Sequence, residues 1–82
     1  MSAPSDEWAT VLWDDDVTLQ AYVVHVLMRR FGCSRERARE LMELAQRDGR
    51  TQVARGSREE QEMLVAGLHG DGLLATLERV PS

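Results

Sequence analysis

Apolar residues recur along the 82-residue chain with two spacings, and each spacing predicts one kind of secondary structure. Alternating apolar and polar residues, rich in Val, Thr and Trp, indicate half-buried strands. Apolar residues three and four positions apart indicate helices with one buried face. These patterns predict strands at 8–13, 51–55 and 73–80 and helices at 19–30, 35–47 and 58–69.

The first predicted helix has the clearest apolar face. Its positions i, i+3, i+4, i+7 and i+8 are all apolar and predict a buried stripe of Leu19, Tyr22, Val23, Val26 and Leu27. Thr18 is a suitable N-cap, because its hydroxyl can accept a hydrogen bond from an unpaired N–H of the first turn. Gly32 is placed to be the C-cap.

The other two helices carry their own start and stop signals. Ser34 can cap the second helix, and Gly49 ends it. Ser57 followed by Glu60 is a capping-box pattern that starts the third helix. The residues of this third helix expected to be partly buried are Met63, Leu64, Val65 and Leu68.

The order of elements is therefore β-α-α-β-α-β. Few strands separated by helices predict an α+β fold, with a three-stranded antiparallel sheet and three helices packed on one face. The length suits one domain with one modest core. We assign residues 8–82 to that domain and residues 1–7, which show no periodicity, to a short flexible N-terminal arm.

The composition argues against several classes of protein. The net charge is −4 and no basic stripe dominates a face, so a nucleic-acid partner is not expected. The single cysteine, Cys33, cannot form an intramolecular disulfide or a Cys-rich zinc site. No apolar run approaches the ~20 residues of a membrane span, and the start lacks signal-peptide features. We expect a cytoplasmic protein with no membrane partner.

Three consecutive carboxylates, Asp14, Asp15 and Asp16, stand between the first strand and the first helix. They repel one another, although a helix N-terminus nearby favours negative charge. The residues alone leave two interpretations open. The run is either a solvated acidic turn or the lip of a cation-binding site.

The chain offers little for catalysis. His25 lies outside the apolar stripe of its helix, His69 lies at a helix end, and Cys33 has no histidine near it in sequence. The aspartate run lacks the alternating spacing and the distant Glu of a calcium loop. We therefore expect no catalytic residue, no metal site and no cofactor.

The motifs together resemble the ClpS adaptor family, particularly its actinobacterial members. The run from Val11 to Val24, VLWDDDVTLQAYVV, is similar to the Asp-rich motif of that family. Further similar segments follow in the family's order, at 31–34, 38, 41–42, 48–49, 56–59, 68–69 and 72–77. The resemblance extends without a visible gap from about Trp8 to Val80, which is nearly the whole chain.

This resemblance implies an adaptor function. ClpS proteins recognise the N-terminal residue of a protein, the N-degron, and deliver that protein to a Clp-family AAA+ unfoldase. The α-amino group of the degron is a cation with three donors. The resemblance assigns its acceptors to Asp14, Asp15 and Gln46. It implies a side-chain pocket with a gate at Gln20 and walls at Val23, Met42, Ala45 and Leu73. Periodicity alone places these walls on inner faces, so plain core packing is their alternative interpretation.

The chain departs from the family pattern at the rim of this pocket. Gln46 stands where the family has a His, and its carbonyl can accept from an ammonium but cannot titrate. Gln20 stands where the gate is usually Met, and Asp16 adds a third negative charge. We therefore predict altered or weakened preference for bulky Phe, Leu, Trp or Tyr N-termini, in favour of a more polar first or second residue.

The resemblance also implies a docking surface. It places Glu59 and Glu62 where the family meets the N-domain of a ClpC- or ClpA-type unfoldase, although a solvated helix start is the alternative interpretation. Two rival functions stay open. One is a peptide- or helix-binding module that does not read an amino terminus, and the other is a small enzyme or metal site that uses the aspartates.

Overall fold

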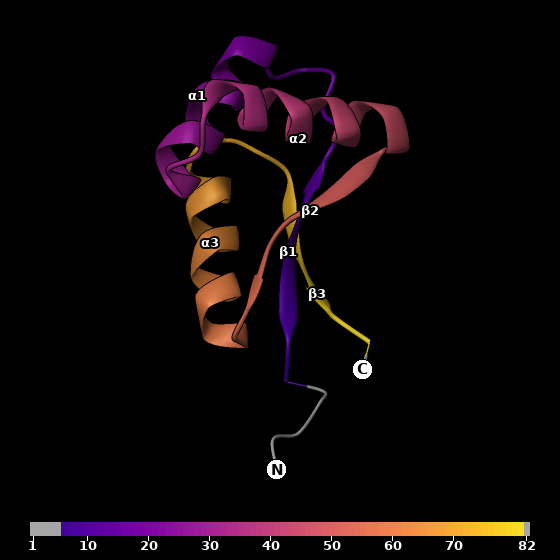
Figure 1. The fold of residues 1–82 in the computed structure, drawn as a ribbon, viewed down its shortest axis with the longest axis vertical. Helices are drawn as coiled ribbons and strands as arrows, with labels where there is room; N and C mark the ends of the chain where they lie inside the picture. The colour runs from indigo at the N-terminus through magenta and orange to yellow at the C-terminus, as the bar shows by residue number, and fades with distance from the viewer. Residues whose placement is uncertain (1–5, 82) are drawn as a thin grey trace.

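A computed structural model describes residues 6–81 and has the predicted α+β architecture (Figure 1). The elements follow in the predicted order, as β1 (Trp8–Trp13), α1 (Gln20–Phe31), α2 (Arg35–Asp48), β2 (Arg50–Gly56), α3 (Arg58–Gly70) and β3 (Ala75–Arg79). The sheet has the strand order β2-β1-β3, and β1 is antiparallel to both neighbours. Part of the predicted arm, residues 1–5, lies outside the described residues.

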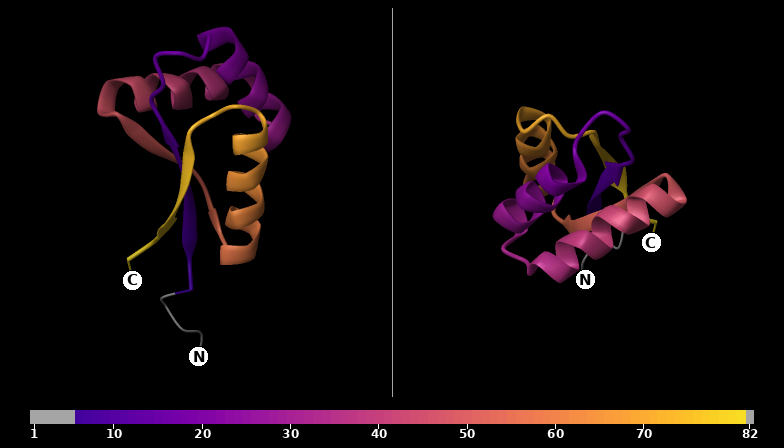
Figure 2. Two further views of the ribbon diagram at one scale, coloured as in Figure 1. Left: turned by 180° about the vertical axis from the view of Figure 1, so that it is seen from behind. Right: turned by 90° about the horizontal axis from the view of Figure 1, so that it is seen from above.

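The helices lie on one face of the sheet, as predicted. Thr10 on β1 donates a hydrogen bond to Gln61 on α3, and Leu12, two residues further on, packs into the core with α1 and α2. Side chains two apart on a strand share a face. Figure 2 shows α1 and α2 side by side across one end of the sheet, whereas α3 runs along the strands.

The opposite face of the sheet is covered by long polar side chains rather than by a helix. Val11, in the middle of β1, is fully buried and pairs with Gln52 on β2 and Thr76 on β3. The Glu78 carboxylate accepts hydrogen bonds from Arg50 and, at 3.0 Å, from Gln52. These polar side chains bond to one another between the two outer strands, on the face of the sheet to which Val11 belongs.

The start of α1 differs from the prediction. Leu19, not Thr18, is the N-cap residue, and it makes no side-chain capping bond. Leu19 is 77% exposed because it precedes the helix with extended backbone, so the helical spacing does not carry it to the core. Tyr22 was also expected on the buried stripe. It is exposed, and its hydroxyl donates to the carbonyl oxygen of Asp71 instead.

The remaining caps were predicted correctly. Gly32 ends α1 with a left-handed backbone at φ 64°, and Gly49 ends α2 at φ 85°. The Ser34 hydroxyl accepts from the Arg37 N–H. The capping box between Ser57 and Glu60 is complete in both directions.

The buried face of α3 was predicted only in part. Leu68 is buried, whereas Met63 is 77% exposed and the prediction of its burial is wrong. Gln61 takes a core position with 2% exposure, because its side-chain oxygen accepts the Thr10 hydroxyl at 2.8 Å and so remains paired. A spacing argument that counts only apolar residues misses such a position.

The last strand is shorter than predicted. It begins at Ala75 rather than Leu73, because residues 71–74 form a turn that closes the end of α3. Gly72 has φ 85° in this turn, and the Leu73 N–H bonds back to the carbonyl oxygen of Leu68 at 2.9 Å. In the part of the chain that the structure describes, no helix is long and apolar enough to cross a membrane.

Candidate functional site

A small cavity opens between the end of β1, the acidic loop, the start of α1, α2 and the turn before β3. Its lining consists of Leu12, Trp13, Asp14, Asp15, Thr18, Gln20, Val23, Met42, Ala45, Gln46 and Leu73. The cavity volume is about 20 Å³, room for roughly one water molecule. In this shape it takes only a small group.

The eight residues that the sequence predicted for degron binding all line this one cavity. Asp14, Gln20 and Gln46 are exposed and Asp15 is half-buried, and these four form its rim. The buried residues form its floor, and they are Val23, Met42, Ala45 and Leu73. These four also belong to the hydrophobic core, so each of them packs in the core and lines the cavity at the same time. Their role in binding stays a prediction.

Three lining residues were not predicted. Leu12 and Trp13 end β1, and Thr18 follows the acidic run. The Trp13 ring is held in place because its Nε1 donates to the Thr76 hydroxyl at 2.8 Å and the Arg50 guanidinium lies over it, 5.3 Å from the ring centre. The signal in the sequence that could have indicated Leu12, Trp13 and Thr18 as lining residues was their position beside the aspartate run.

The acidic loop is ordered by its own side chains. The Asp15 carboxylate accepts from the Val17 N–H at 2.9 Å and from the Thr18 hydroxyl at 2.8 Å. These two hydrogen bonds, the Val17 one foremost, hold the pKa of Asp15 below its usual range. The Asp14 N–H donates to the carbonyl oxygen of Gly49 at 3.0 Å and so ties the loop to the end of α2.

The rim is suited to a cation. An ionised carboxylate offers about four acceptor positions, so Asp15 keeps free acceptor capacity after its two bonds within the loop. Asp14 adds an exposed carboxylate to the rim, and Gln46 adds an amide oxygen, whereas Asp16 is exposed beside the rim and does not line the cavity. An ammonium group carries three donors, and charged hydrogen bonds of this kind are the strong ones.

Glu59 and Glu62 lie apart from this cavity. Both are exposed on the first two turns of α3, which begin at the end of the sheet remote from α1 and α2 (Figure 1). Glu62 pairs with Arg58 at 3.5 Å, one turn earlier. Their predicted role in docking is not tested by this placement.

Comparison with known proteins gives a consistent result. A family model described as "ATP-dependent Clp protease adaptor protein ClpS" matches residues 3–76. The ClpS adapter protein of Mycobacterium leprae is 43% identical over 82 residues, covering 95% of this chain and 76% of its own. That of Nocardia farcinica is 40% identical over 79 residues, covering 96% and 74%.

A solved structure shows the same fold. It is that of Agrobacterium tumefaciens ClpS2 bound to L-phenylalaninamide, with a TM-score of 0.79 and 24% sequence identity. The similarity covers 93% of this chain and 99% of that one. The family model and the 40–43% identical relatives place the protein in the class of small non-catalytic adaptors that serve a protease. The chain belongs to the ClpS family, which delivers N-degron substrates to a Clp protease.

Proposed function

We propose that the cavity holds the first residue of an N-degron. In this proposal Asp14, Asp15 and Gln46 accept hydrogen bonds from the α-amino group, and the first side chain enters between Val23 and Leu73. The observation that carries it is the convergence of a carboxylate rim and a buried apolar floor on one cavity. The solved ClpS2 is bound to L-phenylalaninamide, a ligand that combines a free α-amino group with an apolar side chain.

We further propose that the preference among first residues is altered. Gln20 and Gln46 place two amides at the mouth, where they remain satisfied only by water or by a ligand with polar groups. The cavity is too small for a phenyl ring in its present shape. A bulky first side chain must therefore displace lining residues of the cavity, whereas a small one need not.

Peptides that differ only at the first residue test both proposals. We expect binding of peptides with a free α-amino group, a ranking in which Phe and Leu do not lead, and loss of binding on N-acetylation. Equal binding of the acetylated peptide would contradict amino-terminal recognition and favour an internal-peptide or helix-binding module. An ordinary preference for Phe and Leu would contradict only the altered specificity.

Two reverse substitutions sharpen this test. Gln20→Met restores the usual gate and Gln46→His the usual acceptor. If these positions set the preference, the double variant gains affinity for Phe and Leu peptides relative to polar ones. If its ranking stays that of the unsubstituted chain, the preference is set elsewhere in the cavity.

We also propose that the chain acts in the cytoplasm with a ClpC- or ClpA-type unfoldase, whose N-domain meets Glu59 and Glu62. Charge reversal of both residues should abolish binding of that N-domain in calorimetry and leave peptide binding unchanged. Glu36→Arg, on the exposed start of α2, is the matched control. Equal N-domain binding by all variants would place the docking surface elsewhere.

A further inference from the structure

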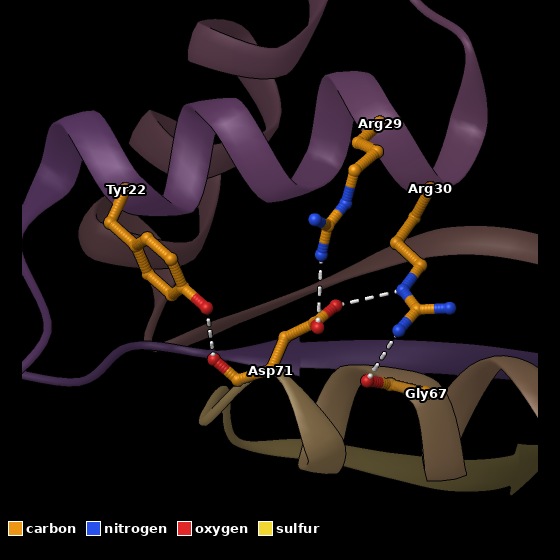
Figure 3. Close-up of polar contacts among 5 residues, drawn as sticks. All are labelled: Tyr22, Arg29, Arg30, Gly67 and Asp71. Carbon is orange, nitrogen blue, oxygen red and sulfur yellow. Dashed lines mark hydrogen bonds and ion pairs between the residues drawn. The ribbon is translucent and has the colours of Figure 1, made fainter.

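Asp71, in the turn after α3, is the point where several polar contacts from α1 meet (Figure 3). Its carboxylate accepts from Arg29 at 3.1 Å and from Arg30 at 2.7 Å. Its main-chain carbonyl accepts from the Tyr22 hydroxyl at 2.7 Å. Arg30 also donates to the carbonyl oxygen of Gly67 at 3.1 Å. We call these five residues the Asp71 clamp.

The clamp lies directly beside two walls of the cavity. Tyr22 precedes Val23, and Asp71 stands two residues before Leu73, and both Val23 and Leu73 line the cavity. The turn is also fixed at its other end, because the carbonyl oxygen of Leu74 accepts from the N–H of Trp13 at 3.0 Å. Leu73 is therefore held between one anchor on α1 and one on β1.

The Asp71 contacts differ from ordinary surface ion pairs. The Asp71 side chain is 11% exposed, and its two arginines lie 42 and 41 residues away in sequence. The ion pairs Arg37–Glu40, Arg47–Asp48 and Arg58–Glu62 instead join near neighbours within a helix, with acidic partners about half exposed. Such exposed pairs contribute little. The Arg30 guanidinium, which donates to the Asp71 carboxylate, holds the pKa of Asp71 below its usual range. The Asp71 carboxylate of the clamp is therefore ionised at neutral pH.

We propose that Asp71 is a positioning residue for degron recognition, because the clamp sets the gap between Val23 on α1 and Leu73 in the turn. This inference rests on the proposed function of the cavity. An apolar pocket binds a side chain best when its walls are held in the bound arrangement beforehand. Loss of the clamp removes these polar contacts between α1 and the turn, so binding must first order the two walls.

Asp71→Ala tests the proposal by peptide affinity, measured well below the unfolding temperature. Affinity should fall by about three- to thirtyfold, the range seen for residues that act through a packed network. The loss should be largest for the peptides whose first side chain best fills the cavity. The differences in affinity between peptides with different first residues should therefore become smaller, which compresses their ranking. Glu40→Ala, which removes an exposed ion pair on α2, should leave affinity and ranking unchanged.

Two milder variants keep the proposal falsifiable if Asp71→Ala does not fold. Tyr22→Phe removes only the hydroxyl that reaches Asp71. Gly67→Ala places a methyl group 2.9 Å from the Arg30 guanidinium and pushes that side chain aside. Both should compress the ranking in the same direction. Arg30→Ala combined with Asp71→Ala should cost no more affinity than Asp71→Ala alone if the two act as one unit.

Failure of this inference is distinguishable from failure of the proposed function. If Asp71→Ala and Tyr22→Phe bind every peptide within twofold of the unsubstituted chain, with amine dependence intact, the clamp is not a positioning device. If the unsubstituted chain binds acetylated and free peptides alike, the proposed function itself is wrong, and the clamp has no degron to position.

Discussion

The Asp15 carboxylate accepts the Thr18 hydroxyl at 2.8 Å, and this contact closes the acidic loop on itself. Thr18 stands one residue before the N-cap, Leu19, so α1 begins without a side-chain cap and the Thr18 hydroxyl serves the loop instead. The contact also fixes the direction of the Asp15 side chain at the rim of the cavity. Asp15 therefore both builds the loop and offers an acceptor within it.

Neutralising the aspartates one at a time should separate these roles. Asp15→Asn should weaken peptide binding by at least about thirtyfold, because an ammonium partly removed from water would lose a charged acceptor. Asp14→Asn should weaken it as well. Asp16 is exposed and does not line the cavity, so Asp16→Asn is the matched control and should change affinity much less. Retention of full affinity by Asp15→Asn in calorimetry would remove Asp15 from the proposed site.

The pH dependence of binding should have two limbs. Because the pKa of Asp15 is lowered in the ordered loop, the ionised carboxylate stabilises that loop at pH values above the usual Asp pKa. This stabilisation disappears as the pH falls through the lowered pKa of Asp15. At the alkaline end, affinity should fall above about pH 8, where the peptide α-amino group loses its proton. Between about pH 5 and 7 it should be flat, because Gln46, the third proposed acceptor, does not titrate.

Thr18→Val tests the acidic limb. Removing the hydroxyl raises the pKa of Asp15 towards its usual range, so acid loss of binding should begin at a higher pH than in the unsubstituted chain. The measurement is the peptide dissociation constant against pH, together with carbon NMR titration of Asp15. A step in affinity near the ordinary His value of about 6.5 would instead implicate a histidine.

Two methionines provide a matched pair for the floor of the cavity. Met42 is 7% exposed and lines the cavity, whereas Met63 is 77% exposed on α3. Met42→Ala should lower the free energy of unfolding by about 2–5 kcal/mol and should also weaken peptide binding. Met63→Ala should change neither. If Met42→Ala lost stability but kept full affinity, Met42 would be core alone and not part of the pocket.

Local signals in the sequence were sufficient for the order of elements and most helix ends. Ser34, Ser57 and the glycines Gly32 and Gly49 act through neighbouring backbone groups, so their roles can be predicted from adjacent residues. The rim and floor residues were placed by family resemblance, and the structure brings them to one cavity. Periodicity alone could not have assembled them, because they come from four separate segments: the acidic loop, α1, α2 and the turn before β3.

Features that depend on partners far along the chain could not be predicted. The Tyr22 hydroxyl is drawn outward by Asp71, 49 residues away, so a residue that fits the buried spacing is exposed. Gln61 is buried because Thr10, 51 residues earlier, pairs with it. In each case one tertiary hydrogen bond accompanies a burial opposite to the one that the hydrophobicity of the side chain predicts.

The Thr10–Gln61 contact should be a stability determinant with no role in binding. Thr10→Val leaves the buried Gln61 amide without its partner, and such an unpaired group costs about 1–3 kcal/mol. Combining it with Gln61→Leu should recover part of that loss, because both ends then become apolar. Chemical denaturation measures the effect. If the double variant were as unstable as the sum of the singles, the two residues would not be coupled.

The turn that carries Leu73 should depend on the backbone of Gly72 more than on that of its neighbour Gly70. Gly72 has φ 85°, a left-handed conformation that costs an L-residue about 1–2 kcal/mol. Gly72→Ala should therefore reduce stability, and it should weaken peptide binding because Leu73 shifts with the turn. Gly70 is helical, and a Cβ there meets nothing within 4 Å, so Gly70→Ala should be neutral or stabilising. Equal affinity of the two variants, each measured where it is folded, would show that the turn geometry does not reach the cavity.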